Sequence, residues 1–391
     1  MDVTLITAPD EFVALRPALD DLAGRCVQPC AFLTFAWLDA AWQWRRDSAS
    51  LYLLCCRDEG RLVGLLPLVR MHAAETLGAR PLEFLAVPDT QVCDAIVESA
   101  RRDAVSGALA EALARRRGEW DVVRLRYLPR DSVMATVVAR ALLERGIRSE
   151  SREATANYFV ALTTSWDVYY GGRSRRLKKS VNLVANRLAK TGAITIECNA
   201  AKPGEFLDVD GLVAGIADVS ARSWKAVTGN SLDRPGPNAF IRRLTEHGAA
   251  CGWLSVWTLR VDGRALATEY QLVADGNVYA LRSDFDADCE QTSPGSHLSR
   301  HLLEHLFGRG LERYLMGPGS NAYKLRWATA SEPVYEMTVY GRSARGRLLL
   351  FWELAVKPPL RRLRERLRIA RAPASESGAQ EENQGSRERA E

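Results

Sequence analysis

One segment of the chain, residues 277–327, constrains the fold more than any other. Residues 277–283 are short, apolar and β-prone, and residues 312–316 form a second run of the same kind. Between them leucines recur at every fourth position, which predicts a helix with one buried face. A Gly-Pro-Gly run at 317–319 ends the second strand. A strand, a crossover helix and a strand in this order predict an α/β unit.

The Ser-Pro-Gly-Ser run that opens this helix is the first candidate for a ligand site. Ser293 can cap the free amides, and Pro294 suits the first helical position because its missing N–H has no partner there. Gly295 and Ser296 are small, so a ligand can approach the backbone closely. Free amides and the positive end of the helix dipole favour a phosphate. A crossover helix that is capped without any ligand is the alternative interpretation.

Two Asp-Gly turns precede this segment. Asp262-Gly263 separates two β-prone runs, and Asp275-Gly276 separates the second run from the strand at 277–283. These turns predict a three-stranded antiparallel meander. The first half of the chain also alternates strands and helices, so the predicted fold class is α/β (α+β). A faint duplication lies in the two hairpins. Leu51, Arg57, Gly60 and Arg61 match Leu254, Arg260, Gly263 and Arg264 at one constant offset.

Charge and cysteine usage narrow the function classes. The net charge is +5, with 53 Lys and Arg against 48 Asp and Glu, which is too mild for a surface that binds nucleic acid throughout. The N-terminus lacks a basic region followed by an apolar run, and every apolar run is too short to span a bilayer. The eight cysteines form no CxxC pair. These features predict a cytoplasmic protein with reduced thiols.

A series of motifs extends over residues 30–340. They are FLTFAWL at 32–38, LVGLLPLV at 62–69, RSRRLKKSVNLVANRL at 173–188, RSW at 222–224, VDGRALA at 261–267, TSPGSHL at 292–298 and GPGSNAYKLRWA at 317–328. Their order resembles the CelD/BcsL-type acetyltransferase-like family. That family is a branch of the GNAT N-acyltransferase superfamily and is related to the FemAB-type aminoacyl transferases.

The resemblance implies two tandem GNAT-like domains, each a mixed, largely antiparallel sheet flanked by helices. We place the N-terminal domain at residues 1–153 and the acyltransferase domain at residues 154–345. Residues 346–372 contain a basic amphipathic helix, Leu360–Arg371, which either touches the inner face of a membrane or lies solvated on the domain. Residues 373–391 are polar and predicted to be disordered.

Four residues are candidates for catalysis. In the family the Tyr-Lys step is a recurrent motif. Tyr323 can therefore act as a general acid, and Lys324 can stabilise an oxyanion or hold a phosphate. Packing and surface solvation are the alternative roles for this pair. Asp284 and Glu269 are candidate bases, although turn chemistry alone accounts for an aspartate at 284. Leu315 stands where related sequences often place an acidic residue, so no base is carried over from that position.

Acceptor binding is predicted from a basic segment and one tryptophan. Arg173, Arg176 and Lys178 precede an apolar helical pattern and can hold an anionic acceptor, or they form a solvated helix face. No aromatic residues are interleaved with these charges, so tRNA is the weaker option. Trp224 resembles a family aromatic at the acceptor cleft, although burial is the default for tryptophan. Three histidines from 297 to 305 lie too far apart to share one ion, so no metal is predicted.

These observations predict an N-acyltransferase that moves an acyl group, with acetyl favoured, from acyl-CoA to an amine of a sugar, a cell-envelope precursor or a polysaccharide precursor. Two alternatives stay open. One is a FemAB-like transferase that depends on aminoacyl-tRNA. The other is a non-catalytic accessory protein of exopolysaccharide biosynthesis that keeps the fold without the activity.

Overall fold

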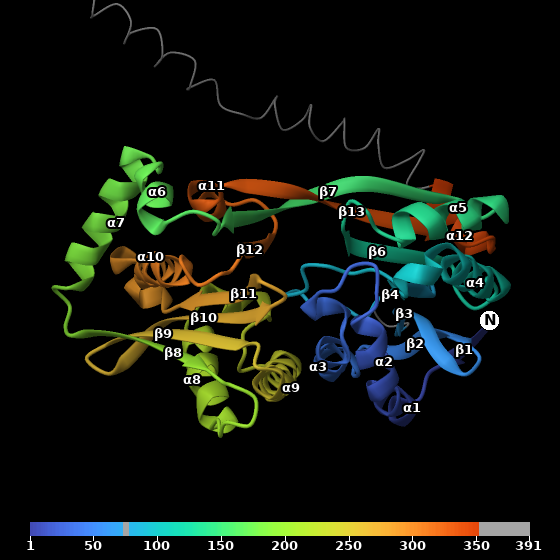
Figure 1. The fold of residues 1–391 in the computed structure, drawn as a ribbon, viewed down its shortest axis with the longest axis horizontal. Helices are drawn as coiled ribbons and strands as arrows, with labels where there is room; N and C mark the ends of the chain where they lie inside the picture. Colours follow the sequence, from blue (N-terminus) through green and yellow to red (C-terminus); the bar gives the residue numbers. More distant parts are fainter. Residues whose placement is uncertain (73–77, 352–391) are drawn as a thin grey trace, which may run out of the picture.

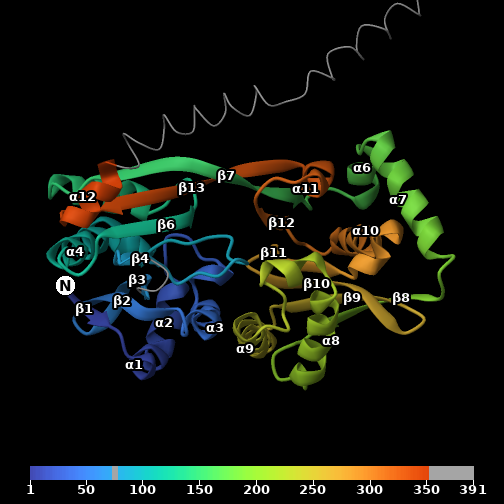
Figure 2. The same cartoon turned by 180° about the vertical axis from the view of Figure 1, so that it is seen from behind.

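The computed structural model describes residues 1–72 and 78–351, and it shows two halves side by side (Figures 1 and 2). A single sheet of thirteen strands runs through both halves. In sheet order the strands are β1 (Asp2–Ile6), β2 (Ala49–Asp58), β3 (Arg61–Met71), β4 (Pro81–Phe84), β6 (Val122–Leu128), β13 (Ala330–Tyr340), β7 (Ser149–Ala161), β12 (Arg313–Pro318), β11 (Asn277–Phe285), β10 (Arg264–Ala274), β9 (Leu254–Val261) and β8 (Ile194–Ala200), while β5 (Ile96–Val97) pairs with β3.

The two halves exchange a strand at the centre of the sheet. β7 follows the N-terminal half in sequence but pairs with β12, and β13 follows the C-terminal half but pairs with β6. β7 and β13 also pair with each other, so the two predicted sheets are joined into one. We therefore call residues 1–148 and 330–351 the N-terminal half, and residues 149–329 the C-terminal half. The predicted boundary between residues 153 and 154 lies inside β7.

Most neighbouring strands are antiparallel. In the described residues the parallel pairs are β4 with β6 and β11 with β12, one pair in each half. The predicted α/β class with a largely antiparallel sheet is confirmed. The Asp-Gly turns lie where they are expected, because Asp262 and Asp275 both have the left-handed φ that such hairpins need.

Helices cover both faces of each half. The N-terminal half carries α1 (Pro9–Ala14), α2 (Arg16–Ala23), α3 (Phe35–Arg45), α4 (Arg102–Arg115), α5 (Ala139–Glu144) and α12 (Ala344–Phe351). The C-terminal half carries α6 (Trp166–Gly171), α7 (Arg175–Leu188), α8 (Val209–Ala221), α9 (Pro235–Cys251), α10 (Pro294–Leu306) and α11 (Ala322–Trp327). α4 covers one face of the N-terminal sheet and α2 and α3 the other, while α10 and α7 lie opposite α8 and α9 (Figure 1).

A shared apolar core holds the halves together. α3 packs on α9, and the ring of Trp37 meets the ring of Phe240 edge-on at 5.4 Å between centroids. Phe32 meets Tyr279 of β11 in the same manner at 5.1 Å. Aromatic pairs of this kind stabilise by about 1 kcal/mol beyond the area that they bury. The contact fixes the N-terminal half against β11, where the candidate site lies.

The first helical segment is broken in two. The apolar side chains of Phe12, Leu15, Leu19 and Leu22 have a helical spacing, but the segment is divided into α1 and α2 at Leu15. Pro17 explains the break, because its ring occupies the position of a backbone N–H and is tolerated only in the first turn of a helix. The predicted helix at 360–371 and the predicted disordered tail lie outside the described residues. Among the described helices, none has the length and apolar content needed to cross a membrane.

Candidate active site

The parallel strands of the C-terminal half separate after a short ladder. β11 and β12 pair only between residues 277–279 and residues 313–315. β11 then continues to Phe285, whereas β12 bulges and pairs with β7 on its other side. Ligands bind at the carboxyl ends of such strands because the diverging backbone edges have no strand partner there. We call residues 280–285 and 316–318 the C-terminal splay.

Lys324 lies at this splay. α11 begins directly after β12, and the Asn321 side chain accepts a hydrogen bond from the Lys324 amide at 2.9 Å. The Lys324 ammonium donates to the carbonyl oxygens of Gly317 at 2.7 Å and Pro318 at 2.9 Å. No described carboxylate pairs with it, and burial lowers its pKa to about 8. The splay therefore holds a positive charge whose partners are neutral.

A buried network joins Glu269 to Tyr323. Glu269 is 1% exposed, and it accepts hydrogen bonds from Tyr314 at 2.6 Å, Gln271 at 2.7 Å and Ser283 at 2.8 Å. Burial raises the pKa of Glu269, so its carboxyl binds a proton more readily than an exposed one. The phenols of Tyr314 and Tyr323 also lie near each other, and each affects the pKa of the other. The network connects a carboxyl group to a phenol through one intervening hydroxyl.

Tyr323 also contacts the start of α10. Its hydroxyl donates to Ser299 Oγ at 2.9 Å, and Ser299 Oγ donates to the Gly295 carbonyl at 2.8 Å. Burial raises the pKa of Tyr323, so the phenol keeps its proton at neutral pH. The predicted donor loop and the predicted Tyr-Lys step are thus neighbours, although they are separated by about one turn of α10.

Ser293 does not cap α10, so this prediction is wrong. Its φ of 49° is left-handed, and its hydroxyl donates backwards to the Glu290 carbonyl at 3.0 Å. The Ser293 carbonyl instead accepts hydrogen bonds from the amides of Ser296 and His297. Pro294 begins the helix as predicted and is buried. Within the described residues, the Gly295 amide is left without a partner, so the helix start offers fewer free amides than the sequence predicted.

Asp284 is held by two cations. It is 2% exposed, and its carboxylate lies 2.8 Å from Lys225 Nζ and 3.7 Å from Arg282 Nε. One carboxylate oxygen faces Lys225 and the other faces Arg282, so both oxygens are already engaged in ion pairs. This arrangement favours Asp284 as a positioning residue and leaves Glu269 as the candidate base.

The candidate acceptor residues have different surroundings. Arg173 donates to the carbonyls of Trp327 and Ala328, and Lys178 donates to the Gly171 carbonyl, so both stabilise the local fold. Arg176 is exposed. Trp224 is 56% exposed rather than buried, so the default for tryptophan is wrong here. It lies beside Lys225, whose ammonium is 6.0 Å from the Trp224 ring centroid.

Sequence reasoning missed the contribution of the N-terminal half. Gln91 donates to the Ala280 carbonyl of β11 at 2.9 Å, where the ladder with β12 has ended. Asp89 lies 2.9 Å from Arg282, which is 2% exposed at its side chain. The arginine at position 282, within an otherwise apolar strand, could have predicted this contact, because a buried guanidinium requires a carboxylate partner. The segment between β4 and β5 thus forms one wall of the C-terminal splay.

The described residues offer no group of three metal ligands. His301 and His305 instead pack against Trp257, with ring centroids 6.0 Å and 4.8 Å away.

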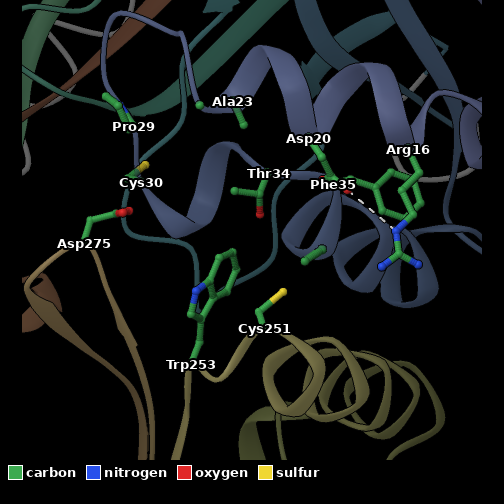
Figure 3. Close-up of a pocket in the computed structure, with 12 residues that line it drawn as sticks. Arg16, Asp20, Ala23, Pro29, Cys30, Thr34, Phe35, Cys251, Trp253 and Asp275 are labelled. Atoms are coloured by element: carbon green, nitrogen blue, oxygen red, sulfur yellow. Dashed lines mark ion pairs between the residues drawn. The ribbon is translucent and has the colours of Figure 1, made fainter. Parts of the chain in front are cut away.

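A separate cavity of about 300 Å³ lies between the halves at the opposite end of β11 (Figure 3). Cys30 and Phe35 line it from the N-terminal half, and Cys251, Trp253 and Asp275 from the C-terminal half. Burial raises the pKa of the Cys30 thiol to about 12 and also raises that of Cys251. Both thiols are therefore protonated at neutral pH, which disfavours a nucleophilic role.

Comparison with known proteins identifies one domain of the chain and its fold. Residues 175–325 match the family described as the acetyltransferase (GNAT) domain. The fold resembles FemX, with a TM-score of 0.56 and 12% identity over 86% of this chain and 97% of that chain. It also resembles L-PGS from Bacillus licheniformis, with a TM-score of 0.51 and 12% identity over 89% and 97%. At such identity these likenesses show the fold alone.

A third similar structure is a protein of unknown function from Bacteroides thetaiotaomicron. Its TM-score is 0.53, with 13% identity over 87% of this chain and all of that chain (100%). No curated protein matches the sequence. The matched domain, residues 175–325, is of the acetyltransferase (GNAT) type, which supports N-acyl transfer, and the fold of the whole chain resembles that of FemX. The narrower CelD/BcsL resemblance rests on the motifs quoted above.

Proposed function

We propose that this N-acyltransferase moves an acyl group, with acetyl favoured, from acyl-CoA to a primary amine of a sugar, a cell-envelope precursor or a polysaccharide precursor. The observation that carries the proposal is the Lys324 ammonium. It has only carbonyl partners among the described residues, and it lies where β11 and β12 separate. A preorganised cation in a poorly hydrated site stabilises negative charge that develops in a transition state.

The proposed reaction forms a bond between the amine nitrogen and the thioester carbonyl carbon, and it breaks the carbon–sulfur bond. The amine loses one proton, and the leaving thiolate gains one. Glu269 accepts the proton from the amine through the Ser283 hydroxyl, and Tyr323 gives its proton to the thiolate. Glu269 then returns its proton to Tyr323 by way of the Tyr314 hydroxyl, which is hydrogen-bonded to Glu269 and interacts with the Tyr323 phenol. Each group ends the cycle in its starting state.

Donor and acceptor would use different walls of the C-terminal splay. The start of α10, Ser293 to Ser296, would face the donor phosphates, with the Gly295 amide as the available donor group. Trp224 and Arg176 are exposed and would contact an acceptor that carries a ring or a negative charge. Asp284 would position Lys225 beside Trp224.

The proposal is tested by following the release of free CoA from acetyl-CoA in the presence of a panel of amino sugars and small primary amines. Binding of acetyl-CoA and of longer acyl-CoAs is measured in parallel by calorimetry. We expect micromolar to millimolar donor binding and CoA release that depends on the amine. A chain that binds no acyl-CoA would contradict the proposal.

A second candidate is aminoacyl transfer from tRNA. The exposed side chains of Arg175, Arg176 and Lys179 on α7 favour it, because several free cations on one helix can contact phosphates. If it is correct, transfer of an aminoacyl group is lost after RNase treatment, whereas acetyl-CoA turnover is unaffected by RNase.

The cytoplasmic location and the contact of residues 360–371 with the inner face of a membrane are further parts of this proposal. Co-sedimentation of the full chain with anionic vesicles tests the contact, and a chain truncated at Pro358 is the control. Equal sedimentation of both chains would contradict it.

A further inference from the structure

The N-terminal half has its own pair of parallel strands that separate. β4 and β6 pair over residues 81–83 and 122–124, which equals the three-residue ladder of β11 and β12. β6 then bulges against β13, as β12 bulges against β7. In both strands the penultimate residue is left-handed, with φ of 62° at Tyr127 and 81° at Gly317. The backbone that forms the C-terminal splay therefore occurs twice in this chain.

A cavity of about 240 Å³ lies at this second divergence, between the end of α3, the end of β4 and the outer part of β6. We call it the N-terminal pocket, and its polar lining consists of Arg45, Glu83, Arg124, Arg126 and Tyr127. A tyrosine rarely adopts a left-handed φ, and such strained residues gather at binding sites. The strain at Tyr127 thus coincides with the wall of a cavity.

The pocket has an excess of positive charge. Arg124 and Arg126 are exposed, and neither guanidinium group has a hydrogen bond or an ion pair with any described residue. Arg45 lies 3.7 Å from the Glu83 carboxylate, and its buried Nε has no hydrogen-bond partner in the described structure. Three guanidinium groups thus line the pocket with one carboxylate, and two of the three are free to bind a ligand.

We propose that the N-terminal pocket binds a phosphate-bearing small molecule. Guanidinium groups form paired, charge-assisted hydrogen bonds with phosphate oxygens, and three of them can surround one phosphate or pyrophosphate group. The volume is below the range of about 300–1,000 Å³ that holds a drug-sized ligand. The pocket therefore accommodates a sugar phosphate or the phosphate end of a larger molecule. This site is separate from the C-terminal splay, and it does not depend on the proposed acyl transfer.

The test is a calorimetric titration of the full chain with inorganic pyrophosphate. We expect binding whose affinity falls steeply as salt increases, because the contacts are ionic. Arg124→Ala combined with Arg126→Ala should weaken binding at least tenfold. Arg130→Ala is the matched control, since Arg130 is exposed just after β6 but does not line the pocket. Lys324→Ala should leave binding unchanged.

A variant that is expected to tighten binding, rather than weaken it, makes the test stricter. Glu83→Gln removes the carboxylate from the pocket and releases Arg45, so it should tighten pyrophosphate binding several-fold. Circular dichroism and thermal unfolding confirm that each variant is folded. Absence of binding to the wild-type chain, full affinity in the double variant, or loss of binding in Lys324→Ala would each overturn the proposal. The last result would place the anion in the C-terminal splay instead.

Discussion

The two places where parallel strands separate share a backbone but differ in chemistry. In the C-terminal half the strand bulge contains Gly317, and a buried network connects Glu269 to Tyr323 beside a lysine with neutral partners. In the N-terminal half the bulge contains Tyr127, and free arginines line an open pocket. The comparison teaches that one backbone can carry a buried hydrogen-bond network in one half and solvated arginines in the other. We propose that the first transfers protons and that the second binds an anion.

The helices that follow these strands also differ in how their first amides are capped. The helix start at Val133 and Met134 is capped by the buried carboxylate of Asp94, which accepts their amides at 2.6 Å and 3.0 Å. The Lys324 amide is instead capped by the neutral side chain of Asn321. A carboxylate cap neutralises the positive end of a helix, whereas an amide cap does not. The helix start that follows β12 therefore keeps more of its own positive potential than the one that follows β6.

Replacing Lys324 should have the largest effect. Lys324→Ala removes the ammonium from the C-terminal splay, and kcat/KM for acyl transfer should fall by about 10²–10³-fold, the usual loss when one oxyanion donor is removed. CoA release under saturating acceptor measures the change. Arg326→Ala on the same helix is the control, because its side chain is exposed. Equal losses in both variants would show that the helix, rather than the ammonium, is responsible.

Replacing Asp94 tests the role of the carboxylate that caps the helix start at Val133 and Met134. Burial raises the pKa of Asp94 to about 6 from 3.8, so the folded chain binds its proton more tightly than the unfolded chain does. Stability from this group is therefore fully present below pH 3.8 and declines as the pH rises to about 6. Asp94→Asn cannot ionise. The unfolding free energy of the wild type minus that of the variant should fall by roughly 2 kcal/mol between pH 4 and pH 7.

Urea unfolding at several pH values measures this difference. The subtraction removes the contribution of other groups that titrate in the same range. A difference that stays constant with pH would mean that Asp94 keeps an ordinary pKa, and the contrast between the two helix starts would then rest on geometry alone.

A smaller effect is expected in the pH dependence of activity that Lys324 causes. Since burial lowers the pKa of Lys324 to about 8, the ammonium is present below that pH and is lost as the pH rises through it. Lys324→Arg stays charged over the whole range. The ratio of wild-type to Lys324→Arg activity should decline about tenfold from pH 7 to pH 9. A flat ratio would contradict a role for the charge.

The smallest expected effect concerns the bulge itself. Gly317→Ala puts a side chain at φ 81°, which should lower the unfolding free energy by about 1 kcal/mol. Its Cβ would lie 3.8 Å from Lys324 Nζ, so there is room for the atom and the loss is one of backbone strain. Gly215→Ala, in open space on α8, should stabilise the chain instead. Chemical denaturation of both variants distinguishes strain from a general effect of alanine.

Local patterns in the sequence determined the order of strands and helices, the Asp-Gly hairpins and the start of α10 at Pro294. These features depend on turn geometry and on apolar periods, which act over a few residues. They also placed Tyr323 and Lys324 directly after a strand. The left-handed Ser293 was not predictable in this way, because its conformation is imposed by the turn that precedes it.

Only the tertiary structure decided which strands complete each half and which residues meet at the splay. β7 and β13 change places between the halves, and Gln91 reaches Ala280 across 189 positions of sequence. The ion pair of Asp89 with Arg282 joins the halves in the same way. Such contacts depend on the packing of α3 against α9, which buries apolar surface from both halves. An isolated segment could bury its apolar face against several partners. Only the complete fold leaves one of these partners available.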